Sequence, residues 1–297
     1  MQWTSWINAF RLRTLPLALS CIGMGAFLAA DAGAFRIDIF ILCIITTIFL
    51  QILSNLANDY GDFIHGADHA GREGPHRTVQ SGVISPSHMR MAVVVFVVLC
   101  LISGLSLIIV SLGFKVVALL FFVVLGVLSI AAAVTYTLGR KPYGYVGLGD
   151  LAVLIFFGFV GVCGSYYLFT REFDWAHILP SVSCGFFAMG VLNVNNMRDI
   201  ESDRKAGKMS IPVRIGLSRA ILYHWFLIAG GVAAALAYSL LRFQSQWQFL
   251  FLLSVPFFVR NAFAVGNVPS NQLDPWLRQL AFSTLLFVLL FGIGQVM

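Results

Sequence analysis

Residues 91–110 read MAVVVFVVLCLISGLSLIIV, and this stretch decides the fold class of the chain. It contains no charged residue and presents apolar side chains on every face of a helix. A helix of about 20 such residues spans the hydrocarbon core of a bilayer. A membrane β-barrel would instead need short strands in which apolar and polar residues alternate. The stretch therefore predicts a transmembrane helix.

The rest of the chain repeats this pattern. Hydrophobic residues make up 59% of the 297 positions and charged residues 11%, whereas soluble domains are roughly half apolar and a quarter charged. We predict an all-α, polytopic membrane protein that forms one domain over 1–297. Its nine predicted spans are 14–31, 38–58, 90–111, 115–137, 150–170, 176–196, 219–240, 246–262 and 278–296.

The residues before the first span predict a helix at the membrane surface. Trp3, Trp6 and Phe10 recur at helical spacing beside Arg11 and Arg13, which is typical of a helix lying along the lipid headgroups, with a frayed tail as the alternative. The first span lacks a convincing small-residue cleavage site, so we expect no cleavable signal peptide. The five cysteines fall inside the spans without metal-ligand spacing, which favours packing roles over disulfides or zinc.

The basic residues predict the orientation of the spans. Of the 19 Lys and Arg residues, 15 fall on the side of the amino terminus. The other four lie on the opposite side, at Arg36, Lys115, Arg171 and Arg242. Because cytoplasmic loops carry an excess of Lys and Arg, we expect the amino terminus and the loops after even-numbered spans to face the cytoplasm. The same bias accounts for the net charge of +6, so we expect no nucleic-acid partner.

Acidic residues gather on this same side, although the bias in basic residues does not require them there. They concentrate in two loops, 58–89 after the second span and 197–218 after the sixth. The clusters read Asn-Asp-Tyr-Gly-Asp at 58–62 and Asp-Ile-Glu-Ser-Asp at 199–203. Because both spans run toward the cytoplasm, we expect the clusters to meet at one membrane face. The shared pattern also predicts two four-helix halves plus a ninth helix.

The spacing within the first cluster places its acids on one face of a helix. If the second span continues past Asn58, then Asn55, Asp59 and Asp62 share a face at i, i+4 and i+7. Each acid would then lie on the helix one turn after an asparagine, Asp59 after Asn55 and Asp62 after Asn58.

The sixth span repeats this geometry. Asn195, Asp199 and Asp203 fall at i, i+4 and i+8, which again lines them up along one helical face. Asn196 lies near the edge of that stripe, and Glu201 points away from it. The two spans therefore predict two facing stripes of amides and acids.

Ionised carboxylates brought close together repel one another unless a cation joins them. Mg²⁺ prefers oxygen ligands and completes its octahedron with water and phosphate oxygens. We therefore predict that the two acidic clusters together form a Mg²⁺ site. Zinc would favour His or Cys, and the histidines of loop 58–89 form no tight pair. Solvated carboxylates, or carboxylates bridged to Arg, are the structural alternative.

The basic residues beside the clusters suit a diphosphate, because guanidinium groups bind phosphate oxygens in bidentate fashion. Many of them also fit the ordinary excess of basic residues in cytoplasmic loops. Arg77 is favoured for function by its place in the first acid-bearing loop. The candidate bases are Arg72, Arg77, Arg140, Lys141, Arg198, Arg204, Lys205 and Lys208.

The two motifs, at 55–62 and 195–203, resemble the aspartate-rich motifs of the UbiA-type intramembrane prenyltransferases. The resemblance covers essentially the whole chain, since that family likewise has nine helices with motifs after the second and sixth. The Tyr136 to Lys141 segment also resembles the family's Tyr-x-x-x-basic-basic segment. One departure is Asp68, which follows Asp62 by six residues instead of four and is a doubtful ligand.

Residues 51–62 and 141–150 are most similar to those of the bacterial 1,4-dihydroxy-2-naphthoate polyprenyltransferases of menaquinone synthesis. This resemblance implies a polyprenyl diphosphate donor, an aromatic acceptor and Mg²⁺, in the inner membrane of a bacterium with the site on the cytoplasmic side. Loss of the diphosphate would leave an allylic cation that the naphthoate ring attacks, and the ring carboxylate would leave as carbon dioxide to give demethylmenaquinone. An apolar, water-poor site would hold the isoprenoid tail and protect the cation.

The resemblance also implies roles for individual residues. Asp59, Asp62, Asp199 and Asp203 would bind the metal, and Lys141 would assist them in catalysis. Substrate would be bound by Asn55, Asn58, Arg72, Arg77, Tyr136, Arg140, Asn195 and Asn196. For the asparagines, capping or interhelical hydrogen bonds are the alternative.

Two further readings of the sequence stay open. The acids could bind the coupling ion of a secondary transporter, although such sites typically lie near the midplane at broken helices. The enzyme could also be a sister prenyltransferase that acts on 4-hydroxybenzoate, haem or chlorophyllide. Asp150, at the start of the fifth span, could cap its helix or contact the acceptor.

Overall fold

The computed structural model describes residues 3–66 and 78–297. Every regular element in these ranges is helical, and nine helical runs are long and apolar enough to cross a membrane. The predicted all-α class and the nine spans are therefore confirmed. Asp68, Arg72 and Arg77 lie outside the described residues.

The first four spans are single helices preceded by a short amino-terminal segment. The helix α1 expected from the Trp3, Trp6 and Phe10 spacing is present, with Trp3 84% exposed. A 3₁₀ turn, η1, joins it to the first span. The elements are α1 (Trp3–Phe10), η1 (Leu12–Thr14), α2 (Leu15–Asp31), α3 (Ile37–Ile64), α4 (Pro86–Leu112) and α5 (Val116–Thr135).

Of the remaining five spans, the fifth and the eighth are not uniform α-helices. The fifth has a π-helical centre, η2, between two short α-helices, and the eighth begins as a 3₁₀ helix. Two short helices, α9 and α10, follow the sixth span. The elements are α6 (Gly149–Val153), η2 (Leu154–Gly164), α7 (Ser165–Thr170), η3 (Trp175–His177), α8 (Ile178–Arg198), α9 (Ile200–Lys205), α10 (Ile211–Ile215), α11 (Leu217–Leu241), η4 (Gln246–Ser254), α12 (Val255–Asn267), η5 (Ser270–Gln272) and α13 (Asp274–Val296).

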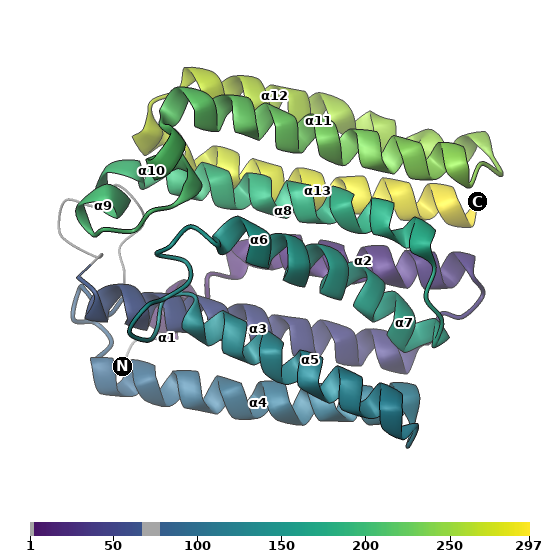
Figure 1. Ribbon diagram of the computed structural model, residues 1–297, viewed down its shortest axis with the longest axis horizontal. Helices are drawn as coiled ribbons and strands as arrows, with labels where there is room; N and C mark the ends of the chain where they lie inside the picture. Colours follow the sequence, from purple (N-terminus) through teal and green to yellow (C-terminus); the bar gives the residue numbers. More distant parts are fainter. Residues whose placement is uncertain (1–2, 67–77) are drawn as a thin grey trace.

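The spans lie side by side along the long axis of the molecule (Figure 1). In the first half α3 packs on α4, and in the second half α8 packs on α11, so the corresponding spans of the two halves have corresponding neighbours. The ninth span, α13, packs on α2, α8 and η4. Stacked and edge-on phenyl rings fill the core of the second half, which contains Phe187, Phe251, Phe258, Phe287 and Phe291.

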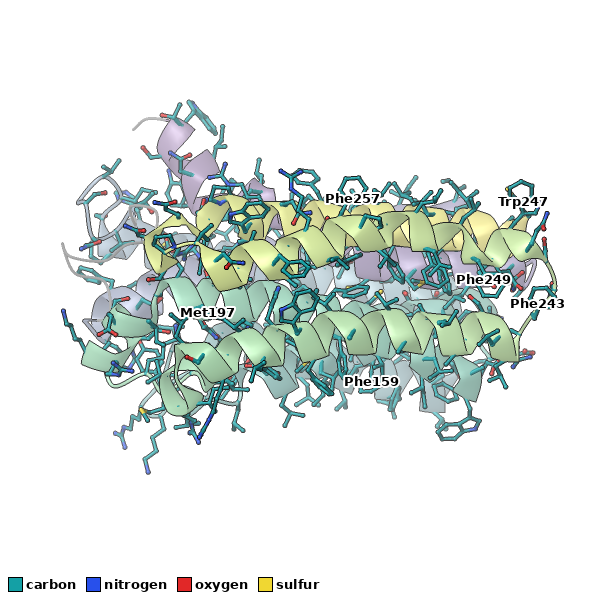
Figure 2. The ribbon with its side chains drawn as sticks, turned by 90° about the horizontal axis from the view of Figure 1, so that it is seen from above. Phe159, Met197, Phe243, Trp247, Phe249 and Phe257 are labelled. Atoms are coloured by element: carbon teal, nitrogen blue, oxygen red, sulfur yellow. The ribbon has the colours of Figure 1, made fainter. Side chains whose placement is uncertain are left out.

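Apolar side chains also cover the outside of the bundle. Phe257 and Trp247 project outward from the eighth span (Figure 2), and each is 44% exposed. Such side chains would be costly in water but are solvated by lipid tails. The chain is thus a multi-pass membrane protein.

One end of the bundle gathers the polar elements. The amino terminus, the end of α3, and α9 with α10 lie at the same end in Figure 1, and the carboxyl terminus lies at the other. Helix α3 has 28 residues and is about 42 Å long at 1.5 Å per residue. The hydrocarbon core of a bilayer is only about 30 Å thick. The last turns of α3 can therefore extend beyond the hydrocarbon with their acids.

Candidate active site

A chamber of about 400 Å³ opens between the spans of the bundle. Its wall is mostly apolar and includes Leu107 and Phe122, which lie at the end of the bundle far from the acids. Its polar wall is at the acidic end and contains Arg11, Asn55, Asn58, Asp62, Tyr136, Asn195 and Lys208. The chamber therefore joins a polar mouth to a long apolar interior.

The first acidic stripe forms as predicted, because α3 continues through Ile64. Asn55, Asp59 and Asp62 are all buried. The Asn55 amide donates to the Phe10 carbonyl at 2.9 Å, which ties α3 to the amino-terminal segment. Asp62 accepts a hydrogen bond from the Tyr145 hydroxyl at 3.0 Å.

Asp59 is paired with a base from the amino-terminal segment. Its Oδ1 forms an ion pair with Arg11, and its Oδ2 accepts a long hydrogen bond from the Thr78 hydroxyl at 3.4 Å. Arg11 has positive backbone dihedrals, φ 49° and ψ 51°, and such a conformation is uncommon for a residue with a Cβ. The turn between α1 and η1 thus directs a guanidinium onto the first acidic stripe.

The second stripe forms across a break in the helix. Helix α8 ends at Arg198, Asp199 forms a turn with φ −94° and ψ 13°, and α9 follows. The Asp199 amide still donates to the Asn195 carbonyl at 3.1 Å, and the Asp203 amide donates to the Asp199 carbonyl at 2.8 Å. The predicted spacing is kept although the helix is not continuous. Glu201 points away as expected, with its side chain 67% exposed.

Asp199 is held by the residue before it. Both of its oxygens accept from the buried Arg198 guanidinium at 2.9 Å. Arg198 also donates to Asn195 Oδ1 at 2.8 Å and to Asp274 Oδ1 at 2.8 Å. The structural alternative named above, a carboxylate bridged to an arginine, therefore applies to Asp199. A ligand would have to bind lone pairs of this carboxylate that Arg198 does not occupy.

Lys208 brings the two stripes together. It is 7% exposed, and its Nζ donates to Asp203 Oδ1 at 3.2 Å. Burial opposes its charge, but the nearby charges of Asp203, Asp62 and Asp199 raise the pKa of the Lys208 ammonium well above its ordinary value. Since Asp62 comes from α3 and the other two acids from the α8–α9 segment, this ammonium lies among acids of both motifs.

Asp203 itself lies behind that ammonium. Burial raises the pKa of its carboxyl, an effect that Lys208 opposes and that the charges of Asp199 and Asp62 reinforce. Its Oδ2 is buried and has no hydrogen-bond partner among the described residues. A buried carboxylate oxygen without a partner is costly unless it meets a cation or a donor.

Tyr136 forms part of the same wall. Burial raises the pKa of its hydroxyl to about 12. The loop that follows wraps around it, because the Gly144 amide donates to the Tyr136 carbonyl at 3.0 Å. Asn58 Oδ1 accepts from the Thr137 hydroxyl at 3.2 Å. Residues 136–149 thus close the polar end of the chamber against α3.

The sequence pattern of the UbiA prenyltransferase family matches residues 18–293. The chain belongs to the UbiA prenyltransferase family. It is 43% identical to 1,4-dihydroxy-2-naphthoate octaprenyltransferase of Escherichia coli (strain K12), over 98% of this chain and 94% of that protein.

Solved structures share the fold of this UbiA-family protein. The apo structure of a UbiA homolog from Aeropyrum pernix K1 is 18% identical, with a TM-score of 0.69 over 96% of this chain and 97% of that one. A UbiA homolog from Archaeoglobus fulgidus, solved bound to DMAPP and Mg²⁺, is 19% identical with a TM-score of 0.62 over 96% and 98%.

The donor set of this UbiA-family protein fits Mg²⁺ better than zinc. Within 3–66 and 78–297, no three His, Cys, Asp or Glu side chains converge to hold a metal ion by themselves. Mg²⁺ is usually bound by one or two carboxylates together with water and substrate phosphates, so it needs no such cluster. The partnerless Asp203 Oδ2 is an oxygen of the required kind. The residues present therefore fit a magnesium ion that is shared with a substrate.

Six of the predicted site residues that the structure describes do not line the chamber: Asp59, Asp199, Asp203, Asn196, Arg140 and Lys141. Arg140 and Lys141 follow Gly139, whose φ of 113° turns the chain outward, and their side chains are exposed. Neither forms a hydrogen bond or ion pair with another described residue. Asn196 is buried outside the chamber wall. The sequence favoured Arg140 and Lys141 over Lys208, because no local pattern indicates that Lys208 is buried.

Asp150 does not cap its helix in this structure. Helix α6 begins at Gly149 with no side-chain cap, so the N-cap interpretation is wrong. Its carboxylate instead accepts a hydrogen bond from the Tyr223 hydroxyl at 3.0 Å, between α6 and α11. It lies outside the chamber wall.

Proposed function

We propose that this UbiA-family protein transfers a polyprenyl chain from an allylic polyprenyl diphosphate to 1,4-dihydroxy-2-naphthoate, with loss of the ring carboxylate, and so makes demethylmenaquinone. The observation that carries the proposal is the pairing of an apolar chamber with a mouth where Lys208 and Arg11 stand beside two acidic motifs. Such a mouth suits a diphosphate, and such a chamber suits its tail. The name of the Escherichia coli relative supports the naphthoate acceptor and an octaprenyl donor.

The four acids Asp59, Asp62, Asp199 and Asp203 hold Mg²⁺ in this proposal. The ion, when bound, supplies neutralisation of the charge that the diphosphate gains as it leaves. The archaeal relative of the same fold that was solved with DMAPP and Mg²⁺ supports this choice of metal. Asn55, Asn58 and Asn195, which reach the chamber, orient the donor or its water shell.

The chain's own bases hold the diphosphate. Lys208 and Arg11 line the chamber, and Arg72, Arg77, Arg140 and Lys141 are proposed to act on the diphosphate as well. As the allylic carbon–oxygen bond breaks, the bonding pair leaves with the diphosphate. The naphthoate ring attacks the resulting cation-like carbon, and the carboxylate leaves as carbon dioxide. The apolar wall, with Tyr136 at its polar end, keeps water from the cation.

The protein is proposed to work as one domain in a bacterial inner membrane, with the site on the cytoplasmic side. The acidic end of the bundle carries the amino terminus and most of the basic residues. That asymmetry is the one expected for the cytoplasmic end.

The test is product formation in membranes that contain the protein. Membranes are incubated with 1,4-dihydroxy-2-naphthoate, octaprenyl diphosphate and Mg²⁺, and mass spectrometry identifies the product. We expect octaprenylated product that has lost the mass of carbon dioxide. Chelation of Mg²⁺ should abolish it, and restored Mg²⁺ should return it.

Matched variants test the site assignment in the same assay. Asp62→Asn and Asp203→Asn are expected to lower product formation by about 10²-fold or more, because each removes a carboxylate that would hold the Mg²⁺ beside the leaving diphosphate. Glu201→Gln changes an exposed acid of the same cluster and should leave the rate close to the unmodified protein. Retained activity in Asp203→Asn would disprove the assignment. Product from 4-hydroxybenzoate in place of the naphthoate would establish the sister activity.

A further inference from the structure

Two bases stand between the chamber and two of the acids, Asp59 and Asp203. Arg11 and Lys208 line the chamber, whereas their partners Asp59 and Asp203 do not. A ligand that enters the polar mouth therefore meets these bases before it can reach Asp59 or Asp203, although Asp62 lines the chamber itself. This arrangement is unusual for carboxylates that are to bind a cation, because the bases already hold them.

Lys208 is the more deeply placed of the two bases. Its ammonium has three donors, and the hydrogen bond to Asp203 Oδ1 uses one of them. It also lies within the field of Asp62 and Asp199, which come from opposite motifs. An ammonium in this position neutralises part of the charge that a metal ion would neutralise.

We infer that Lys208 is an internal counter-ion that competes with the divalent metal for Asp203 and transfers to the donor's diphosphate when the metal takes that carboxylate. This inference rests on the proposed function and assigns a role to a residue within its site. The exchange breaks one ion pair, between Lys208 and Asp203, and forms two, between Asp203 and the metal and between Lys208 and the diphosphate.

The physical reason is the repulsion between like charges at short range. A divalent ion bound at Asp203 and the Lys208 ammonium repel each other strongly in a buried site. The diphosphate removes this conflict because it draws the ammonium away from the metal. Metal and donor should therefore each strengthen the binding of the other, by the same factor.

The decisive measurement is the affinity of the purified full-length protein for Mg²⁺ alone, by calorimetry in detergent. Lys208→Met removes the competing charge and is expected to bind Mg²⁺ about tenfold more tightly or better. Lys208→Arg keeps the charge and should stay close to the unmodified protein. Lys205→Met is the matched control, because it removes an exposed lysine of the same segment. Unchanged or weaker Mg²⁺ binding by Lys208→Met would overturn the inference.

A second measurement tests the transfer to the diphosphate. Lys208→Met should raise the KM for the polyprenyl diphosphate by about 10- to 100-fold, because a charge-assisted hydrogen bond to the donor is lost. A lysine that only stabilised the fold would give neither the gain in metal affinity nor this selective rise in KM. An unchanged KM would therefore also overturn the inference.

Folding of Lys208→Met could itself come to depend on the metal, since Asp203 would lose its buried partner. In that case added Mg²⁺ should restore the yield of folded protein, and absence of rescue would count against the inference. Failure of the proposed function gives a different result: the unmodified protein would then form no prenylated naphthoate, whatever Lys208→Met does to Mg²⁺ binding.

Discussion

The buried guanidinium of Arg198 joins three parts of the chain at the acidic end of the bundle. It lies between Asp199, Asn195 one turn earlier, and Asp274 at the start of α13. Asp274 in turn accepts from Arg13 at 3.0 Å and from Arg278 at 2.7 Å. Because a buried charge has lost most of its hydration, the loss of one partner leaves the others uncompensated.

Arg198→Met should therefore be strongly destabilising. We expect it to lower the free energy of unfolding by about 3–5 kcal/mol, since it leaves Asp199 buried without its base. Thermal or chemical unfolding of the purified protein in detergent measures the change. Arg204→Met removes an exposed base that pairs with the exposed Glu201 at 3.1 Å, and should cost only about 0–1 kcal/mol. Equal losses in the two variants would contradict a structural role for Arg198.

At the same scale, the sequence predicted the acids of the site better than the bases. Asp59 and Asp62 could be placed because i, i+4 and i+7 spacing on a continuous helix is a local property. Lys208 could not be singled out, because its burial depends on how the segment after α9 returns to the chamber. Arg11 was assigned to the membrane surface, since nothing in the local pattern indicated that its turn faces α3. Ion pairs between distant segments leave no periodic signal.

At the scale of the element, the end of α3 is fixed by one glycine. A Cβ at Gly61 would lie 2.5 Å from Thr137 Oγ1 and 2.7 Å from the Thr137 carbonyl oxygen. This close approach allows the Thr137 hydroxyl to donate to the Ala57 carbonyl at 3.0 Å. The glycine therefore lets residues 136–149 close against the helix that carries the first motif.

Gly61→Ala should damage this contact. We expect a loss of about 1–3 kcal/mol in stability from overpacking, together with reduced prenyl transfer because Asp62 lies next to the displaced turn. Gly23→Ala is the matched control, since its Cβ would meet only Val288 Cγ1 at an ordinary 3.5 Å. That change should be neutral or stabilising by up to about 1 kcal/mol. Unfolding and activity measured on both variants check the difference.

The elements also show where helical periodicity stops being informative. The nine spans follow from apolar runs of sufficient length, and their bounds differ from the predicted ones mainly by turns added at helix ends, as in α3. The break at Asp199 was not predicted, because its residues could continue a helix. In the described part of the chain, contacts of Arg198 with Asp199 and of Lys208 with Asp203 help to hold the turn. The π-helical centre of the fifth span was not predicted either, since its sequence is as apolar as its neighbours.

The segment before α8 carries a pH-dependent contact on the opposite side of the membrane. Asp174 accepts from the Ala176 amide at 2.8 Å and pairs with Arg242 at 2.5 Å. Burial works against its charge, but this amide, His177 and Arg242 together hold the pKa of the Asp174 carboxyl below its ordinary value of 3.8. A carboxyl whose pKa is lower in the folded state than in the unfolded state stabilises the protein at pH values above the unfolded-state pKa. This stabilisation is lost as the pH falls through the folded-state pKa.

Asp174→Asn should accordingly matter at neutral pH and not in acid. We expect the unmodified protein to unfold at higher temperature than the variant at pH 7, and the difference to shrink as the pH falls below 3.8 and to vanish once the folded-state carboxyl is protonated. Comparison of the two proteins at each pH removes the effect of the other carboxyls. Glu172→Gln, at a neighbouring exposed acid that makes no ion pair with a described residue, should show no such trend. A difference that persists in acid would rule out the charge as its cause.

At the scale of the whole molecule, the chamber has a polar end and an apolar end, so a bound donor can lie in it in only one orientation. The apolar wall runs through the depth of the bundle, so the donor's tail can stay at the level of the lipid chains while its diphosphate stays at the surface. The diphosphate would therefore enter at the acidic end of the bundle. The basic residues are biased toward this same end, as expected for the cytoplasmic side. We therefore propose that the acidic end faces the cytoplasm.

This orientation can be tested with single cysteines and a membrane-impermeant maleimide. The five natural cysteines are buried and should label poorly. Ser81→Cys places an exposed thiol on the acidic side, and Phe114→Cys places one in the turn between α4 and α5, where the residue is 86% exposed. In intact bacterial spheroplasts, Phe114→Cys should label and Ser81→Cys should label only after the membrane is broken. The reverse pattern would place the acidic motifs outside the cell and would separate them from a donor supplied by the cytoplasm.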